Sequence, residues 1–377
     1  MLLWMLAGSP DHLQQRNTSM PKITLLLALL LLFHAQSHAQ NLEFTDATTL
    51  TLYGKSPHSG AHFHRVDTAR YNDMPPAVKG LSTHSAGLAI AFKTNANEIH
   101  ARWEVKEPMR FSNNMTAIGK RGLDLYIRRD GQWEFAGVGR PGDKAASTFR
   151  LVNNLEEGEK ECLLFLPLYD ELTKLELGVP KGSLVQPHQL TWTGKVVIYG
   201  SSITQGASAS RPGMAYPAQL ARKLNYEFIN LGFSGSGKME ESVAKMVSDI
   251  QGADLFILDC AANPSPQEIA ERTENFVKMI RNRHPNTPIL MIESVVREGG
   301  NFDSMIRKRV SDQNKNFRAA YTRLINSGMK ELYIIHGDDL LGDDHEGTVD
   351  GTHPNDLGFA RMLKVIEPKV REILNSK

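Results

Sequence analysis

Cysteine is nearly absent from this sequence: Cys162 and Cys260 are the only two in 377 residues. Each lies in an apolar, strand-like run, so we expect two buried free thiols; a disulfide formed in an oxidising compartment is the alternative. No spacing of Cys and His resembles a zinc site, and we expect neither a metal nor a cofactor. Excess charge is absent as well, because 43 Lys and Arg balance 42 Asp and Glu. This balance gives no indication of nucleic acid as a partner.

A hydrophobic run long enough to span a bilayer, about 20 residues, is also missing. The apolar stretch ITLLLALLLLF at 23–33 follows Lys22 and precedes the small residues Ser37 and Ala39. A charged start, a short apolar stretch and a small-x-small exit are typical of a secretory signal peptide. We therefore predict that residues 1–39 are an upstream extension and signal peptide, and that the mature chain is periplasmic or secreted, without stable membrane insertion. An uncleaved membrane anchor is the alternative.

The first half of the chain has the two-residue period of strands. Alternating apolar residues that should share one face of a sheet are Leu88, Ile90, Phe92, Ile99, Ala101, Trp103 and Val105. The pair Asp130-Gly131 stands between two alternating runs and predicts a two-residue hairpin turn. No helical period competes, so we predict that residues 40–181 form an all-β, jelly-roll-like sandwich, an accessory domain.

From Lys195 onward, apolar runs alternate with helical stretches. The runs that we predict to be strands are 196–199, 227–231, 255–259, 289–293 and 332–335. The segment SPQE at 265–268 predicts a helix start with a capping box, and a last helix is expected from about Asp356 to Leu374. Five such units predict a three-layer α/β/α, flavodoxin-like domain with a five-stranded parallel sheet over 195–377. The turn-rich stretch 180–194 is the predicted boundary.

Polar residues follow several of these predicted strands, at the sheet edge where α/β proteins build their sites. Acyl transfer at neutral pH needs a nucleophile, a base, a group that orients the base, and donors for the oxyanion. Ser202 is the candidate nucleophile, and His353 and Asp350, three residues apart, are the candidate base and orienting carboxylate. Gly235 offers a backbone N–H and Asn263 a side-chain amide.

Four segments that carry these residues, GSSITQG, NLGFSG, CAANP and DGTHP, resemble in this order the conserved blocks of the SGNH/GDSL hydrolase superfamily. The resemblance covers roughly residues 195–377. It implies a serine esterase in which Ser202 is the nucleophile and Asp350 and His353 complete the triad. The oxyanion-hole donors that it implies are the Ser202 N–H, Gly235 and Asn263.

The sequence departs from the family pattern at two places. Ser201 stands where the family has an Asp that is not a member of the triad, so the chemistry is retained while the geometry of the turn is open. Ala261-Ala262 and Pro264 replace the usual neighbours of Asn263, which itself is present.

Simpler interpretations of the same residues stay open. Ser202 could be a helix N-cap and nothing more, Gly235 a turn glycine, and Asn263 a local turn or cap residue. His345, in the same Asp- and His-rich run, is the rival of His353 for the role of base. The pattern Asp-x-x-His-Pro favours His353.

A β-sandwich placed before an SGNH domain resembles the family 2 carbohydrate esterases of bacteria. This architectural resemblance implies hydrolysis of short-chain acyl esters, O-acetyl esters above all, on oligo- or polysaccharides through an acyl-enzyme intermediate. One alternative is a lipid acylhydrolase of the platelet-activating-factor type, which calls for an apolar groove, whereas GASASRPGM at 206–214 is small and polar. Another is a non-catalytic carbohydrate-binding protein, against which the complete triad argues. The sequence fixes no oligomeric state.

Overall fold

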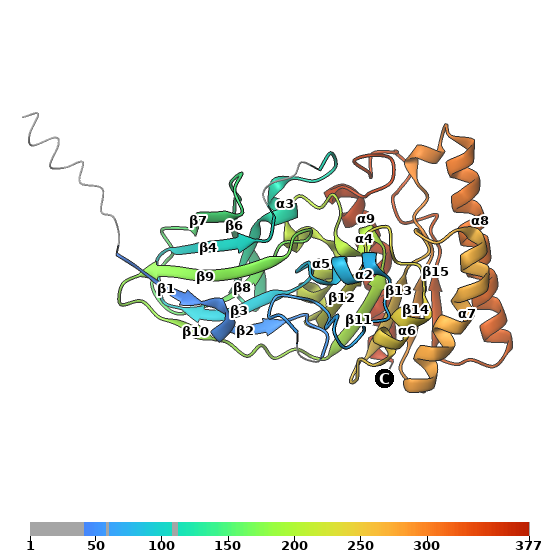
Figure 1. The fold of residues 1–377 in the computed structure, drawn as a ribbon, viewed down its shortest axis with the longest axis horizontal. Helices are drawn as coiled ribbons and strands as arrows, with labels where there is room; N and C mark the ends of the chain where they lie inside the picture. Colours follow the sequence, from blue (N-terminus) through green and yellow to red (C-terminus); the bar gives the residue numbers. More distant parts are fainter. Residues whose placement is uncertain (1–40, 58–59, 108–111, 377) are drawn as a thin grey trace, which may run out of the picture. The chain divides into compact units, whose positions relative to one another are not determined.

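The computed structural model describes residues 41–57, 60–107 and 112–376 (Figure 1). The signal peptide expected in residues 1–39 lies outside this part of the chain. None of the helices in the described ranges has the length and apolarity needed to cross a membrane.

Two antiparallel sheets form a β-sandwich, which we define as residues 42–187. The first sheet has the order β1-β9-β4-β7, with the bounds β1 Leu42–Asp46, β4 Ile99–Val105, β7 Ala146–Val152 and β9 Leu172–Pro180. The second has the order β10-β3-β8-β5-β6, with β2 paired to β3. Its bounds are β2 Thr51–Tyr53, β3 Ala89–Thr94, β5 Leu123–Arg129, β6 Gln132–Gly139, β8 Lys160–Phe165 and β10 Val185–Pro187.

The predicted alternation of the sandwich strands is confirmed. In β4 the apolar positions are buried and the positions between them are half-buried or exposed. All seven residues predicted to share a face lie in one hydrophobic cluster. This cluster includes residues of both sheets, such as Leu125 and Leu177. Cys162 belongs to this cluster, and both cysteines are buried and free, as expected.

The predicted hairpin is confirmed as well. Strands β5 and β6 pair antiparallel, with Arg129 opposite Gln132 and only Asp130 and Gly131 between them. Both turn residues have positive φ, 49° and 78°, as a two-residue turn of type I′ requires.

Three short elements of the sandwich were not predicted. The helices α2 (Pro76–Ser82) and α3 (Ala117–Arg121) interrupt a stretch in which we expected only strands. Each has at most two turns, too few for a helical period to stand out in the sequence. The third, β10, pairs with β3 and lies inside the predicted boundary 180–194, so this stretch is partly sheet.

The remaining chain contains the predicted five-stranded parallel sheet, which we call the third sheet. Its order is β12-β11-β13-β14-β15. The bounds are β11 Lys195–Gly200, β12 Glu227–Gly232, β13 Leu255–Asp259, β14 Ile289–Ile292 and β15 Leu332–Ile335. All five predicted strands are therefore confirmed, to within one residue at either end.

Helices cover both faces of the third sheet, which confirms the three-layer α/β/α class. Their bounds are α4 Ser202–Gln205, α5 Tyr216–Leu224, α6 Glu241–Ser248, α7 Pro266–Arg283, α8 Ser304–Asn326 and α9 Asp356–Asn375, with 3-10 turns at Ala47–Thr49, Pro212–Met214 and Glu298–Gly300. Val197 and Tyr199 share a core with α6, α7 and α8, whereas Val196 and Ile198 share one with α5 and α9. The predicted capping box of α7, formed by Ser265 and Glu268, is present.

The sandwich also contributes to the core of the third sheet. Three residues of the segment that leads into α2, Val66, Tyr71 and Met74, and Val78 within α2 lie in the same cluster as Val197 and residues of α6. Arg65, fully buried, donates hydrogen bonds to the carbonyls of Asn230 and Gly232 at the end of β12, at 2.9 and 2.8 Å. Accordingly, residues 42–377 form one compact unit.

Candidate active site

The turn after β11 presents two serines in different ways. Ser201 is the N-cap of α4, because its hydroxyl accepts a hydrogen bond from the Ile203 N–H at 3.2 Å. Ser202 is the first residue of the helix, and its hydroxyl lines a cleft of about 460 Å³. The turn is tight: a Cβ at Gly200 would lie 2.0 Å from the Thr204 hydroxyl. The cap role therefore belongs to Ser201, and Ser202 is left facing the cleft.

His353 lies in the loop before α9 and contacts Ser202. Its Nε2 lies 2.9 Å from the Ser202 Oγ, and its Nδ1 lies 2.7 Å from the Asp350 Oδ2. The other oxygen of Asp350 accepts hydrogen bonds from the backbone N–H groups of His353 and Thr352, at 2.8 and 3.0 Å. A carboxylate that holds Nδ1–H leaves Nε2 as the acceptor for the Ser202 hydroxyl.

The Asp350 carboxylate is stabilised in its charged form. Burial raises the pKa of Asp350, but hydrogen bonds from the His353 backbone, the His353 ring and the Asn114 side chain outweigh burial and lower this pKa to about 2. Asp350 is therefore a carboxylate throughout the neutral range, and its negative charge can stabilise a positively charged imidazole.

Gly235 and Asn263 line the same cleft as Ser202 and His353. Gly235 has φ +66°, a backbone conformation that other residues adopt at a cost. The Asn263 Oδ1 accepts a hydrogen bond from the Gly237 N–H at 3.1 Å, which leaves the NH₂ end of this amide as the donor. Four of the five residues singled out in the sequence thus line one cleft, and the fifth, Asp350, contacts His353 from outside the lining.

His345 is not part of this arrangement. Its Nδ1 lies 2.8 Å from the Glu298 Oε2 and 3.0 Å from the Asn301 side chain, and it does not line the cleft of Ser202. Of the two rival histidines, only His353 contacts Ser202.

Asn114 is a site residue that the sequence analysis missed. It comes from the turn before α3 of the sandwich, and its Nδ2 lies 3.0 Å from the Asp350 Oδ2 and 3.3 Å from the His353 Nδ1. Because this Nδ1 already faces the carboxylate, we assign the hydrogen bond to Asp350. No local pattern in the sequence marks Asn114, which is 236 positions from its partner.

Comparison with known proteins identifies the family of the chain. Residues 193–371 match the GDSL-like lipase/acylhydrolase family, and residues 42–185 match the N-terminus of SGNH-hydrolase-type esterases. A solved structure from Bacteroides ovatus, of a protein assigned as a GDSL-like lipase, shares 53% sequence identity, covers 89% of this chain and 98% of its own, and has a TM-score of 0.86. The chain belongs to the GDSL-like lipase/acylhydrolase family. It is accordingly an esterase by family, with acyl-ester hydrolysis as its reaction class.

More distant structures share the fold of this GDSL-like esterase. The salicylyl acyltransferase of a tetracycline biosynthetic pathway is 20% identical, with a TM-score of 0.70, and a family two carbohydrate esterase from Cellvibrio japonicus is 13% identical, with a TM-score of 0.57. Each alignment covers 89% of this chain and 98% of the other. A comparison with curated protein sequences found no match.

The sandwich of this esterase holds the nucleophile turn from several directions. The Tyr169 hydroxyl donates to the Ser202 carbonyl at 3.3 Å, and the Thr116 hydroxyl donates to the Ser210 carbonyl at 2.6 Å. Asp124, in the sequence GLDLY at 122–126, binds both the Arg211 guanidinium, at 2.7 Å, and the Gly213 N–H, at 2.8 Å. The first contact is made with α4 itself and the others with the loop that follows it, so the sandwich takes part in shaping the candidate site of the esterase.

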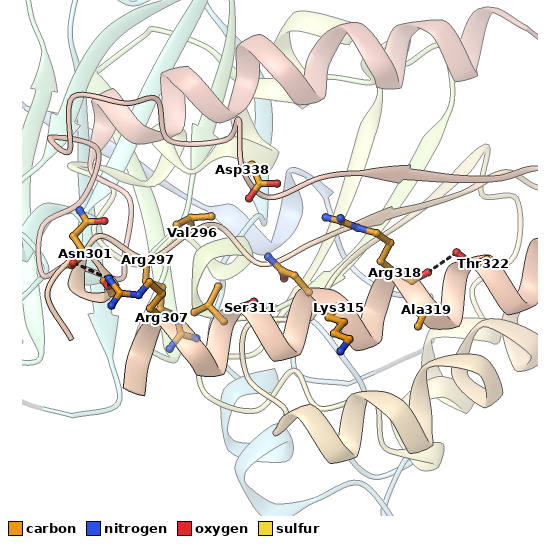
Figure 2. A pocket seen from close by; sticks show the side chains of 13 residues that line it. Val296, Arg297, Asn301, Arg307, Ser311, Lys315, Arg318, Ala319, Thr322 and Asp338 are labelled. Carbon is orange, nitrogen blue, oxygen red and sulfur yellow. Dashed lines mark hydrogen bonds between the residues drawn. The ribbon is translucent and has the colours of Figure 1, made fainter. Parts of the chain in front are cut away.

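A second and larger cavity of about 600 Å³ runs along α8 and is lined in part by its residues (Figure 2). Arg297 and Arg307 lie at one end of it, and Arg318 lies further along the helix. None of the residues proposed for catalysis lines this cavity, and Arg297 is the one residue that it shares with the cleft of Ser202, among the residues that the structure describes. The smaller cleft, not the larger cavity, is the candidate active site of the esterase.

Proposed function

We propose that this protein removes short-chain acyl groups, O-acetyl groups above all, from oligo- or polysaccharides through a covalent acyl-serine intermediate. The observation that carries the proposal is the continuous series of contacts from Ser202 through His353 to Asp350, at 2.9 and 2.7 Å. This is the geometry that activates a serine hydroxyl at neutral pH.

In the first half of the reaction, the Ser202 Oγ attacks the ester carbonyl while His353 takes its proton on Nε2. The carbonyl oxygen becomes an oxyanion and accepts hydrogen bonds from the Ser202 and Gly235 N–H groups and from the Asn263 NH₂. When this intermediate collapses, the bond to the alcohol oxygen breaks. The imidazolium of His353, stabilised by Asp350, donates its proton to that oxygen, and the alcohol leaves.

In the second half, a water molecule takes the place of the alcohol. His353 removes one proton from the water, and the resulting hydroxide attacks the acyl carbonyl at the same oxyanion position. Collapse breaks the bond to the Ser202 Oγ, which recovers its proton from His353. The products are a carboxylic acid and the free enzyme, so no cofactor is consumed.

The chemical character of the cleft supports a carbohydrate rather than a lipid substrate. Its lining residues include Lys238, Asn263, Arg297, Arg309 and Thr352, which suit a hydroxyl-rich substrate better than an alkyl chain. The fold shared with the Cellvibrio japonicus carbohydrate esterase is consistent with this choice. An acylhydrolase acting on long lipid chains would need an apolar groove beside the nucleophile.

Two measurements test the proposal. Turnover of p-nitrophenyl acetate, butyrate and octanoate should fall in this order, and acetate should be released from at least one of a panel of acetylated polysaccharides. The variant Ser202→Ala is the control in each assay. Preference for octanoate, with no acetate release from any polysaccharide, would instead support the lipid acylhydrolase.

A further inference from the structure

The cleft of Ser202 carries an excess of positive charge. Three of its lining residues are cations, Lys238, Arg297 and Arg309, and none of the described residues that line it is an Asp or Glu. None of these three side chains forms an ion pair with a described carboxylate, although the charge of Lys238 acts to lower the pKa values of Glu240 and Glu268. This differs from most of the protein, where Lys and Arg are commonly paired; on α8 itself, for example, Arg318 binds Glu293 at 2.7 Å.

Two of the cations contact the main chain beside the candidate oxyanion hole, Arg297 through a short hydrogen bond and Arg309 through a long one. Arg297 Nη2 donates to the Ala262 carbonyl at 2.6 Å, and Arg309 Nη2 donates to the Asn263 carbonyl at 3.5 Å. A neutral carbonyl positions a guanidinium without neutralising its charge. The segment that carries Asn263 therefore holds two arginines at the cleft with their charge uncompensated.

The environment of Arg297 leaves part of its guanidinium without a hydrogen-bond partner in the described part of the chain. Burial and the neighbouring positive charge of Arg309 lower the pKa of Arg297, and its Nε is buried with no hydrogen-bond partner among the described residues. An unpaired, partly buried cation beside a second cation is costly, and a bound anion would relieve the cost. A guanidinium fork is well suited to a carboxylate, which it can bind through two parallel hydrogen bonds.

We propose that the Lys238, Arg297 and Arg309 side chains form a carboxylate subsite, which makes the enzyme selective for esters that carry a carboxylate close to the ester bond. The inference rests on the proposed function, because it assigns a substrate class to the cleft of Ser202. Two substrate chemistries provide such a carboxylate: an acylated acidic sugar, with the charge in the alcohol part, and a dicarboxylic half-ester, with the charge in the acyl part.

Matched substrates distinguish the two chemistries. For the alcohol part, the pair is methyl glucuronide and methyl glucoside, each acetylated on the same secondary hydroxyl, so that a carboxylate in the first replaces the CH₂OH group of the second, and acetate release is measured. For the acyl part, the pair is monomethyl succinate and methyl butyrate, and methanol release is measured. We expect kcat/KM to be at least about tenfold higher for the charged member of one pair, as a charge-assisted hydrogen bond would provide. Equal kcat/KM within both pairs overturns the inference.

Arg309→Gln tests whether the cations cause this preference, and it is chosen because Arg309 is exposed and its replacement leaves the core intact. We expect the ratio of kcat/KM, charged over neutral, to fall about tenfold, mainly through KM. Lys308→Gln is the matched control: it removes the same charge from the neighbouring position of α8, outside the cleft, and should leave the ratio unchanged.

The remaining outcomes are also decisive. If Arg309→Gln lowers kcat/KM equally for charged and neutral substrates, the cations act on the oxyanion and the carboxylate subsite is wrong. Turnover of p-nitrophenyl acetate separates this failure from that of the proposed function. If the enzyme hydrolyses this neutral ester but shows no preference for a carboxylate, the proposed function stands and the carboxylate subsite is wrong. If the folded protein hydrolyses neither p-nitrophenyl acetate nor any of the matched esters, both the proposed function and the carboxylate subsite are wrong.

Discussion

The Asn114 side chain donates a hydrogen bond to the Asp350 carboxylate, at 3.0 Å, across 236 positions of sequence. Asp350 in turn holds the ring of His353, so the β-sandwich reaches the orienting carboxylate of the candidate triad directly. The half of the chain that we expected to be an accessory domain thus supplies a positioning group for the site. Its contacts with Ser202, Ser210 and Arg211 have the same effect on the nucleophile side.

Asn114→Ala should lower kcat about tenfold and change KM little. The variant removes a hydrogen bond to a charged group, whose loss is worth about 1.5–3 kcal/mol. Asp350 and His353 then lose part of their fixed orientation, on which the transition state depends more than substrate binding does. The measurement is steady-state kinetics with p-nitrophenyl acetate. Asn113→Ala, in the same turn and exposed, is the control and should retain full activity. Equal losses in both variants would mean that the turn as a whole, not the Asn114 side chain, is responsible.

Most of the fold could be predicted from the sequence because its elements depend on local patterns. The alternation in β4, the turn at Asp130-Gly131 and the capping box at Ser265 are each visible within a few residues. The four SGNH blocks likewise keep their order along the chain.

Contacts between distant segments could not be predicted in this way. Asn114 precedes a helix of five residues and belongs to no recognisable motif. Arg297 and Arg309 are two of many cations in a chain of balanced charge, and only the folded main chain around Ala262 and Asn263 brings both to the cleft. The role that we propose for them depends on the lack of a carboxylate paired with either arginine in the described part of the chain, which a one-dimensional pattern does not show.

Ser202→Ala and Ser201→Ala should have different consequences. Loss of the nucleophile should lower kcat by about three or more orders of magnitude, as in other serine hydrolases. Ser201→Ala removes only the N-cap of α4, which should cost about 1 kcal/mol of stability and a minor part of the activity. Esterase kinetics, with circular dichroism as the check on folding, compare the two. An inactive Ser201→Ala variant together with an active Ser202→Ala variant would show that the nucleophile is Ser201 and not Ser202.

Asn263→Ala should reduce kcat by about 10²–10³-fold, the usual effect of removing one oxyanion donor. The loss should appear in kcat more than in KM, because the hydrogen bond strengthens as negative charge develops on the carbonyl oxygen. The same kinetic assay tests this, and Asn263→Asp, which replaces the NH₂ donor with an acceptor, should be at least as damaging. Near-normal activity of the Ala variant would remove Asn263 from the oxyanion hole.

Export is a further prediction, and it concerns residues that the structure does not describe. The signal-peptide pattern around Lys22, 23–33 and Ala39 predicts a mature chain that begins near Gln40. Mass spectrometry of protein prepared from the native host, separated into cytoplasmic and exported fractions, identifies the first residue. Protein that begins at Met1 or Met20 in the exported fraction would mean that no cleavage occurs.

Asp259, behind the nucleophile turn, should make the stability of the protein depend on pH. It is buried at the end of β13, where its Oδ2 accepts hydrogen bonds from the Thr204 and Tyr216 hydroxyls, both at 2.7 Å. Burial raises the pKa of Asp259 to about 6, although these two hydrogen bonds act in the opposite direction. In the unfolded chain the pKa of an Asp is about 3.9.

The sign of the effect follows from proton counting. Between about pH 4 and pH 6 the folded state retains a proton on Asp259 that the unfolded state releases, so the free energy of unfolding falls as the pH rises through this range. The two pKa values correspond to a loss of about 3 kcal/mol. Asp259→Asn removes the titration, and urea unfolding at pH 4.5 and pH 7 should then show a smaller decrease in stability than in the wild type. Asp343→Asn, a carboxyl-to-amide change at an exposed position, should leave the wild-type decrease intact. Equal decreases in the wild type and in Asp259→Asn would show that this carboxyl has the same pKa in both states.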